Sequence, residues 1–355
     1  MIPTAGSERS LLDRFKAYIA LTKPRIIELL LITTVPAMIL ASGGWPGLGL
    51  VTGTVAGGAL SAGGANAINN VVDRDIDALM RRTQNRPLPT ETVSPREALI
   101  LGFVLGSAGF FVLLTAANIA AAALATGALG FYVLIYTIYL KRTTPQNIVI
   151  GGVAGAVPAL VGWAAVTGSI GLPAWLLFAV IFYWTPPHFW ALALRFRADY
   201  EAAGVPMLPV VVGERATAVQ IVVYSFVVSG AALLLQPAAG LGGLYVVSAV
   251  ILGVGFVAGC LSLLRTSSAA TTVFRLSNVY LALLFSAVAL EVLIGEPAAP
   301  SHVIAWIGSL LMVVGTAAIV AVTRPRRIRE LGFVLVPAAG AVAVAFAVLS
   351  KIQVF

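Results

Sequence analysis

Residues 47–90, GLGLVTGTVAGGALSAGGANAINNVVDRDIDALMRRTQNRPLPT, join a long apolar segment to a strongly polar one. The apolar part begins at about Gly47 and is rich in glycine and alanine, which predicts a membrane-spanning helix with small side chains. Gly53 and Gly57 form a small-xxx-small pattern, which permits a second helix to pack closely against this one. The stretch therefore predicts a membrane helix that ends in a polar cluster.

The polar end repeats an amide and two acids at helical spacing. Asn69, Asp73 and Asp77 are four residues apart, so they share one face of a helix, whereas Asp75 points to another side. Mg²⁺ prefers oxygen ligands and is typically bound by one or two carboxylates together with substrate phosphates. One interpretation is therefore a magnesium site. The alternative is a hydrated helix end whose acids only make the loop soluble.

Four arginines in the same stretch, Arg74, Arg81, Arg82 and Arg86, favour the first interpretation. Guanidinium groups bind phosphate oxygens in a bidentate geometry. A site that combines carboxylates with guanidinium groups suits a metal-bridged diphosphate better than a bare cation.

The composition predicts an all-α polytopic membrane protein. Only 10% of the 355 residues are charged, the mean hydropathy is +0.99, and apolar runs of about 20 residues recur along nearly the whole chain. The net charge of +8 comes from basic residues scattered between these runs, which indicates loops beside a membrane and argues against a nucleic-acid partner. Cys260 is the only cysteine, which excludes intramolecular disulfides and zinc sites built from cysteine pairs.

The apolar runs predict eleven membrane spans. Residues 1–22 are predicted to be a cytoplasmic lead-in, because they are polar and mildly basic and lack the apolar core of a signal peptide. Residues 23–295 are expected to form the main transmembrane domain, and 296–355 an additional C-terminal transmembrane hairpin. The spans are expected at about 23–41, 47 to the polar cluster, 97–115, 119–139, 148–166, 171–194, 217–235, 243–264, 274–294, 302–322 and 332–350.

The distribution of basic residues predicts the orientation. All but one of the 22 lysines and arginines fall on the side that holds the N-terminus, and the exception is Lys351. The positive-inside rule then places the N-terminus and the polar loops in the cytoplasm. Because no targeting segment is recognisable, this favours the plasma membrane of a prokaryote.

Several segments resemble the UbiA superfamily of intramembrane prenyltransferases. NNVVDRDID at 69–77, followed by RTQNRPLP at 82–89, is similar to its first signature, and YLKR at 139–142 is similar to its basic loop. Within that superfamily, further segments resemble the protoheme IX farnesyltransferases, or heme O synthases. These segments are LTKPR at 21–25, NIVIGG at 147–152, TPPHFWAL at 185–192, DY at 199–200 and AGVPMLP at 203–209.

The resemblance implies a fold and a reaction. The fold is a UbiA-like bundle of nine transmembrane helices, to which residues 296–355 add the extra hairpin. The reaction transfers the farnesyl group of farnesyl diphosphate to a vinyl group of heme B, with addition of water, to give heme O and diphosphate. Mg²⁺ bound by the aspartates would hold the diphosphate and neutralise charge on the leaving group. Both substrates are largely apolar, which fits a dry site inside a lipid bilayer.

The resemblance also implies roles for individual residues. The implied metal ligands are Asn69, Asp73, Asp77 and Asp199. The implied catalytic residues are these four and Lys141. The implied diphosphate-binding residues are Lys141 and Arg142, with Arg82 and Arg86 as helpers.

The second acidic cluster departs from the pattern of the superfamily. That pattern usually contains a second DxxxD motif, but Arg195 and Ala203 stand four residues before and after Asp199. Asp199 is therefore the best candidate for a thinner second cluster.

Three residues are candidates for contact with heme. His188 lies in an apolar span beside two prolines, and we hypothesise that it faces the pocket and contacts heme at the iron or near the reacting vinyl group. The alternative is a histidine hydrogen-bonded to the carbonyls that the prolines leave free. Lys23 or Arg25 could pair with a porphyrin propionate, although nothing in the spacing requires it.

Two other functions remain open. A UbiA relative could prenylate another aromatic or chlorin acceptor, although the PPHFW and AGVPMLP segments argue against this. A transporter could also have eleven spans, but it would more often place ionisable groups near the bilayer midplane than at one face. For the favoured function, the expected partners are farnesyl diphosphate, heme B, the lipid bilayer and other enzymes of heme A or oxidase assembly.

Overall fold

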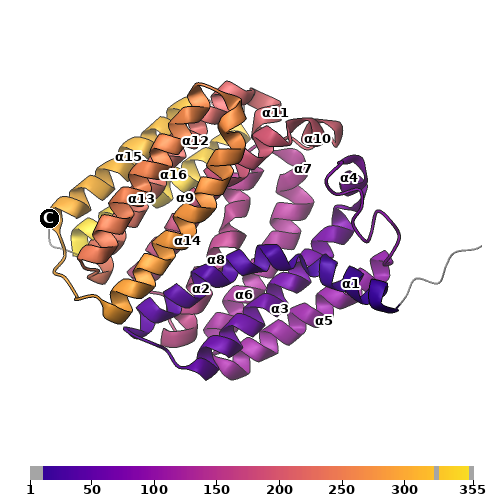
Figure 1. Ribbon diagram of the computed structural model, residues 1–355, viewed down its shortest axis with the longest axis horizontal. Coiled ribbons are helices and arrows are strands. Elements are labelled where there is room, and N and C mark those ends of the chain that lie inside the picture. Colours follow the sequence, from indigo (N-terminus) through magenta and orange to yellow (C-terminus); the bar gives the residue numbers. More distant parts are fainter. Residues whose placement is uncertain (1–10, 324–327, 352–355) are drawn as a thin grey trace, which may run out of the picture.

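The regular structure is helical, without a strand, in the part of the chain that the computed structural model describes, residues 11–323 and 328–351. The long helices form a bundle (Figure 1). They are α2 (Pro24–Ser42), α3 (Leu48–Val72), α5 (Pro95–Ala116), α6 (Ile119–Gly130), α8 (Asn147–Thr167), α9 (Leu172–Arg195), α12 (Glu214–Ala239), α13 (Gly243–Leu261), α14 (Ala270–Ile294), α15 (His302–Thr323) and α16 (Ile328–Lys351). α6 continues into the π-helix η1 (Phe131–Leu140) and α7 (Lys141–Thr143), and α13 continues into η2 (Ser262–Leu264). The all-α fold expected from the sequence is confirmed.

Nine helices within the described residues are long and apolar enough to cross a membrane. Two further helices, α2 and α16, contribute the shorter apolar segments Ile32–Ser42 and Pro337–Lys351. Each of the eleven predicted spans therefore corresponds to one long helix, and the observed bounds differ from the predicted ones by a few residues. The protein is a multi-pass membrane protein.

The helix ends follow local sequence signals. α5 begins with a capping box, in which the Ser94 hydroxyl accepts from the backbone N–H of Glu97 and the Glu97 carboxylate accepts from the backbone N–H of Ser94. α2 and α12 end at Gly43 and Gly240, which adopt the left-handed conformation that glycine tolerates.

α3 and α5 pack closely because glycines meet at their contact. A Cβ atom at Gly64 would lie 2.6 Å from the carbonyl oxygen of Gly102, and one at Gly109 would lie 2.7 Å from the carbonyl oxygen of Gly57. Larger side chains at these positions would push the two helices apart. The close packing predicted for the glycine-rich second span is present, and it fixes the helix that ends in the polar cluster.

The short helices gather at one end of the bundle (Figure 1). α4 (Arg74–Leu79) follows α3, α7 closes η1, and α10 (Arg197–Ala202) and α11 (Leu208–Val212) follow α9. α1 (Leu11–Thr22) packs against α3 and α5. The polar segments that follow the second, fourth and sixth predicted spans are thus brought together, although they lie far apart in the sequence.

The C-terminal helices α15 and α16 pack against α9 and α12. A Cβ atom at Gly230 of α12 would lie 2.8 Å from the carbonyl oxygen of Gly308 of α15, so these two helices are also in close contact. The Tyr183 hydroxyl on α9 donates to the carbonyl oxygen of Pro337 on α16 at 2.6 Å. The additional helical hairpin expected from the sequence is therefore present and is joined to the rest of the bundle.

Candidate active site

Two cavities share a wall in this bundle. The smaller cavity, of about 120 Å³, is polar, and the larger one, of about 270 Å³, is apolar. Tyr132, Tyr136, Ile148 and Phe189 line both of them. The charged and amide residues that line the polar cavity are Lys23, Asn69, Asp73, Asp77, Arg82, Arg86 and Lys141. The pair of cavities matches a ligand with a charged head and an apolar tail.

Asp73 stands at a break between two helices. α3 ends at Val72 and α4 begins at Arg74, while Asp73 between them keeps a near-helical backbone with φ −87° and ψ 0°. The N–H of Asp73 donates to the carbonyl of Asn69 at 2.9 Å, and the N–H of Asp77 donates to the carbonyl of Asp73 at 2.8 Å. The i→i+4 bonds therefore continue through the break, so the three polar residues face one cavity although the predicted helix is not continuous.

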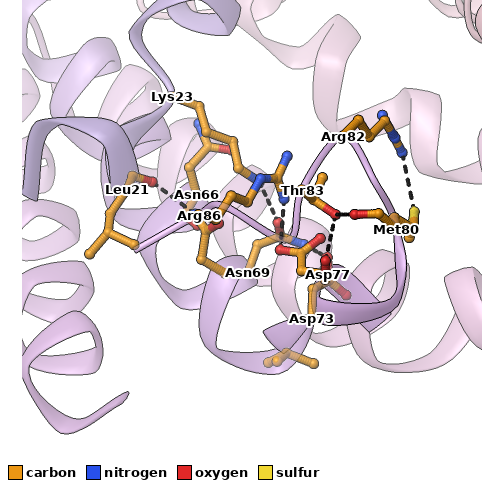
Figure 2. Close-up of polar contacts among 12 residues, drawn as sticks. Leu21, Lys23, Asn66, Asn69, Asp73, Asp77, Met80, Arg82, Thr83 and Arg86 are labelled. Atoms are coloured by element: carbon orange, nitrogen blue, oxygen red, sulfur yellow. Dashed lines mark hydrogen bonds and ion pairs between the residues drawn. The ribbon is translucent and has the colours of Figure 1, made fainter. Parts of the chain in front are cut away.

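Asp73 and Asp77 are buried, and each pairs with a cation. They are 1% and 2% exposed. The Lys141 ammonium lies 2.5 Å from Oδ2 of Asp73, and Nη1 of Arg86 lies 2.7 Å from Oδ2 of Asp77, as Figure 2 shows for the second pair. A buried carboxylate without a countercharge is strongly destabilising, so these pairs allow both acids to be buried.

The donor set of the polar cavity fits a magnesium ion that is held jointly with a ligand. Oδ1 of Asp73 is buried and has no hydrogen-bond partner among the described residues, so it is available to a cation. The same described residues contain no group of three or more His, Cys, Asp or Glu side chains that could hold a metal ion by themselves. Because Mg²⁺ commonly uses one or two carboxylates and completes its shell with phosphate oxygens and water, a diphosphate would supply the missing ligands.

Asp199 does not line either of these cavities. It lies partly exposed on α10, whereas its neighbour Tyr200 is buried and faces the polar cavity. Adjacent residues on a helix point to different sides, and α10 turns its aromatic residue inward. The structure therefore does not bring Asp199 to the three residues with which it was expected to share a metal.

Arg82 is held at the polar cavity by aromatic residues. Its Cζ atom lies 5.4 Å from the ring centroid of Phe196 and 4.8 Å from that of Tyr200. Nη2 donates to the Tyr200 hydroxyl at 2.7 Å. Burial raises the pKa of Tyr200, so this hydroxyl stays neutral at physiological pH. The guanidinium forms no ion pair within the described part of the chain, so its charge is available to an anion.

Arg142 points away from the polar cavity. Its guanidinium donates to both carboxylate oxygens of Asp75, at 2.7 and 2.8 Å, and to the carbonyl oxygen of Val72 at 2.8 Å. These hydrogen bonds lower the pKa of Asp75 to about 2. Asp75 thus points to another side, as its spacing predicts, and it binds the guanidinium that was expected to contact diphosphate.

The apolar cavity has a wall of small residues and an aromatic rim. On α3 and α8 its lining includes Gly58 and Gly155, where an added Cβ atom would meet no other atom within 4 Å. Tyr132 and Tyr136 project from η1, and their rings stack with centroids 5.4 Å apart. Both tyrosines line both cavities, so they stand where a charged head would meet an apolar tail. π-helical segments are rare and are frequent at functional sites.

His188 belongs to the packing between α9 and α14 and lines neither cavity. Its buried ring stacks on Trp184 and Phe274, with centroids 4.2 and 4.6 Å away. Nδ1 lies 2.8 Å from the Ser277 hydroxyl oxygen, which also lies 2.7 Å from the carbonyl oxygen of Phe274. The expectation that His188 faces the pocket is therefore wrong. The ring is satisfied in the core, by a serine rather than by carbonyls freed at the prolines.

Lys23 faces the polar cavity. Its ammonium donates to Oδ1 of Asn69 at 2.6 Å, and Figure 2 shows it beside Arg86 and the two aspartates. Lys23 was one of two candidates from the sequence for contact with a porphyrin propionate, whereas the structure groups it with the residues expected to hold diphosphate. The side chain of Arg25, the other propionate candidate, lies outside the described part of the structure.

Several residues at the cavities had no clear signal in the sequence. The hydroxyl of Thr137 accepts from Nδ2 of Asn69 at 3.0 Å, and this contact joins η1 to the polar end of α3. Tyr132 and Tyr136 are four residues apart, which predicts a shared face, but in an apolar span the same spacing is common in helix packing. Their position depends on the π-helical winding, which the sequence does not predict.

Comparison with known families gives a match over residues 30–279, more than half of the chain, to the UbiA prenyltransferase family. The chain belongs to the UbiA prenyltransferase family. The family expected from the motifs is confirmed, and the matched range ends before the C-terminal hairpin.

This UbiA chain is also similar to individual proteins. It is 53% identical over 286 residues to protoheme IX farnesyltransferase 1 of Saccharopolyspora erythraea, and the alignment covers 79% of this chain and 91% of the relative. The solved structure of a digeranylgeranylglyceryl phosphate synthase has the same fold, with a TM-score of 0.66 at 18% identity over 79% of this chain and 99% of that one. A UbiA homologue from Archaeoglobus fulgidus, bound to GPP and Mg²⁺, gives a TM-score of 0.51 at 16% identity over 77% of this chain and 99% of that one.

Proposed function

We propose that the protein is a protoheme IX farnesyltransferase, which transfers the farnesyl group of farnesyl diphosphate to a vinyl group of heme B and, with water, gives heme O and diphosphate. The observation that carries this proposal is the shared wall between a cavity with buried acids and cations and a cavity lined by apolar residues. The similarity to a protoheme IX farnesyltransferase supports heme as the acceptor.

The polar cavity binds the diphosphate in this proposal. Asp73 and Asp77, with Asn69 beside them, would hold Mg²⁺ together with the diphosphate oxygens. Bound there, Mg²⁺ supplies Lewis-acid neutralisation of the leaving group. The bound Mg²⁺ in the fold relative from Archaeoglobus fulgidus supports this cofactor.

The basic residues of the cavity stabilise charge that develops on the diphosphate. Lys141 and Arg86 lie in the cavity as countercharges of the two aspartates, and Arg82 is fixed there by Tyr200. As the allylic C–O bond breaks, its electron pair leaves on the diphosphate, and cationic donors fixed in advance stabilise that charge without reorganisation. We therefore assign these three residues, in place of Arg142, to the diphosphate.

The apolar cavity holds the farnesyl chain. Its first carbon, which is bonded to the diphosphate, lies at the wall between the two cavities, beside Tyr132 and Tyr136. The faces of these aromatic rings favour positive charge, so they stabilise the allylic carbon while the C–O bond breaks. The surrounding apolar residues exclude water until the heme vinyl group has donated its electron pair to that carbon. Water then adds to the vinyl-derived cation and releases a proton.

The membrane setting completes the proposal. We infer that the polar end of the bundle faces the cytoplasm of a prokaryotic cell, because nearly all basic residues fall on that side of the predicted spans. We assign residues 23–295 to the prenyltransferase domain, 1–22 to a cytoplasmic segment and 296–355 to an accessory hairpin. An apolar product such as heme O stays in the bilayer, so enzymes of heme A or oxidase assembly would take it from there.

A product assay tests this function. Membranes that contain the protein, from a host without the activity, are incubated with heme B, farnesyl diphosphate and Mg²⁺. We expect mass spectrometry to detect a heme with one farnesyl group and one added hydroxyl, and to detect none after chelation of Mg²⁺. Prenylation of an added phenolic acceptor without any farnesylated heme would contradict the proposed acceptor.

A further inference from the structure

The turn between α1 and α2 has an unfavourable backbone conformation. Lys23, the single residue between the two helices, has φ 54° and ψ 61°, in the left-handed region. Among the described non-glycine residues only Lys23 and Glu91 have a positive φ. Glycine adopts this conformation without steric cost, whereas lysine does not. A lysine at this position therefore suggests that its side chain has a use that glycine could not provide.

Buried asparagines of α3 hold this turn in place. Nδ2 of Asn70 donates to the carbonyl oxygen of Leu21 at 3.0 Å, and Nδ2 of Asn66 donates to that of Thr22 at 2.9 Å. Both asparagines are at most 5% exposed. These bonds supply donors to carbonyl groups at the end of α1, which have no N–H donor within the helix. The turn is thus fixed to the same part of α3 that carries Asn69 (Figure 2).

The fixed turn directs the Lys23 side chain into the polar cavity. Its ammonium donates to Oδ1 of Asn69 at 2.6 Å, and the amide of Asn69 in turn donates to Oδ2 of Asp73 at 2.8 Å. Lys23 is therefore one hydrogen-bonded residue away from an acid that we assign to magnesium. Lys16, a lysine on α1, is exposed and does not line this cavity.

The polar cavity contains more basic side chains than acids to pair with them. Four cationic side chains and two carboxylates line it. The two carboxylates pair with Lys141 and Arg86, whereas Lys23 has only a neutral amide as its partner in the described structure. Lys23 and Arg82 are therefore two basic groups that face the cavity without an ion pair among the described residues. An anion with several oxygens, such as a diphosphate, is the complementary ligand.

We propose that Lys23 is a diphosphate-binding residue of the polar cavity, and that Asn66 and Asn70 are positioning residues that hold its left-handed turn. The inference rests on the proposed function, because the diphosphate is that of the prenyl donor. It assigns Lys23 to the donor substrate and not to a propionate of heme.

Binding of inorganic pyrophosphate in the presence of Mg²⁺, measured by calorimetry on the purified full-length protein, tests the inference independently of turnover. We expect Lys23→Met to weaken binding by about tenfold or more, because a charge-assisted hydrogen bond to the ligand is lost. Lys23→Arg, which keeps the charge, should retain part of the affinity. Lys16→Met, on the helix that precedes the turn and away from the cavity, should bind as the unchanged protein does.

Lys23→Gly separates ligand binding from a purely structural role. Glycine accepts the left-handed turn, so this variant should fold and still lose as much affinity as Lys23→Met. Glu91→Gly relieves the other left-handed position and should leave affinity unchanged. If Lys23→Gly bound pyrophosphate normally, Lys23 would only shape the turn and the inference would be overturned.

The positioning residues are tested by kinetics. Asn70→Ala and Asn66→Ala should raise KM for farnesyl diphosphate by about tenfold while KM for heme stays the same, since the turn aims Lys23 at the donor. A rise in KM for heme alone, in these variants or in Lys23→Met, would overturn the assignment and return Lys23 to the propionates. If the unchanged protein did not bind pyrophosphate, the proposed function would be overturned together with the inference. If the unchanged protein, Lys23→Met and Lys23→Gly all bound pyrophosphate equally well, only the inference about Lys23 would be overturned.

Discussion

At the scale of single residues, the acids of one short motif have different surroundings. Asp73 and Asp77 are almost completely buried and have one cation each, whereas the side chain of Asp75 is 60% exposed and is bound by Arg142. An exposed ion pair contributes little to stability, but a buried one that loses its partner is costly. The cavity cations therefore have two roles in this account: they balance the acids in the ligand-free protein and bind diphosphate in the complex.

His188 provides a test at this scale, because the structure assigns it to packing. We expect His188→Ala to lower the free energy of unfolding by about 3 kcal/mol, since the ring loses its stacking on Trp184 within α9 and on Phe274 of α14. KM for heme should change by less than about twofold, because the ring does not line a cavity. Thermal unfolding in detergent and steady-state kinetics measure the two effects.

His302 serves as the matched control, because it is exposed at the start of α15. His302→Ala should change neither quantity. A tenfold rise in KM for heme in His188→Ala, with unfolding unchanged, would show that the ring contacts the acceptor after all.

The site residues differ in how far the sequence could predict them. Asn69, Asp73 and Asp77 converge because helical spacing alone places them on one side, and this could be predicted. The places of Asp199, Arg142 and His188 depend on the rotation of a helix or on a partner from a distant segment. Sequence spacing contains no information on either, so these three residues had to be placed by the structure.

At the scale of elements, the helices that form the apolar cavity combine small residues with an unusual winding. α3 and α8 contribute glycines that leave space, and η1 contributes the two tyrosines that separate this space from the polar cavity. The long helices could be predicted because a membrane span requires about 20 apolar residues. The π-helix and the break at Asp73 could not, because both occur inside segments with a helical pattern.

Gly155 tests the role of the apolar cavity. Leucine at this position would fill open space without meeting other atoms at its Cβ, so Gly155→Leu should fold. We expect KM for farnesyl diphosphate to rise by about tenfold, because the side chain occupies the volume of the chain. Affinity for inorganic pyrophosphate should not change, and steady-state kinetics with calorimetry measure both.

Gly127 on α6 is the matched control, because it is exposed and also has open space around its Cβ position. Gly127→Leu should leave KM for farnesyl diphosphate unchanged. Equal kinetics in the Gly155→Leu and Gly127→Leu variants would contradict the assignment of this cavity to the farnesyl chain.

At the scale of the whole molecule, the fold brings polar loops from distant parts of the chain to one end of a membrane bundle (Figure 1). The helix count could be predicted because each apolar run had to form its own span. The C-terminal hairpin could be predicted to exist, but its contacts with α9 and α12 could not, since they depend on glycines that meet across helices, such as Gly230 and Gly308. The hairpin stands beside the helix that carries Trp184 and Thr185 of the apolar cavity, and none of its described side chains lines either cavity.

The central claim is that Asp73 and Asp77 bind the diphosphate through Mg²⁺ at the polar end of this bundle. The rate of heme farnesylation, measured as a function of Mg²⁺ concentration in three aspartate variants, tests it most directly. We predict that Asp73→Asn and Asp77→Asn each reduce the rate by about 100-fold or more and shift the Mg²⁺ requirement upward. Asp75→Asn should keep the rate within about threefold, because its carboxylate only forms an exposed ion pair. The claim would be contradicted if Asp73→Asn and Asp77→Asn had the same rate and the same Mg²⁺ dependence as Asp75→Asn.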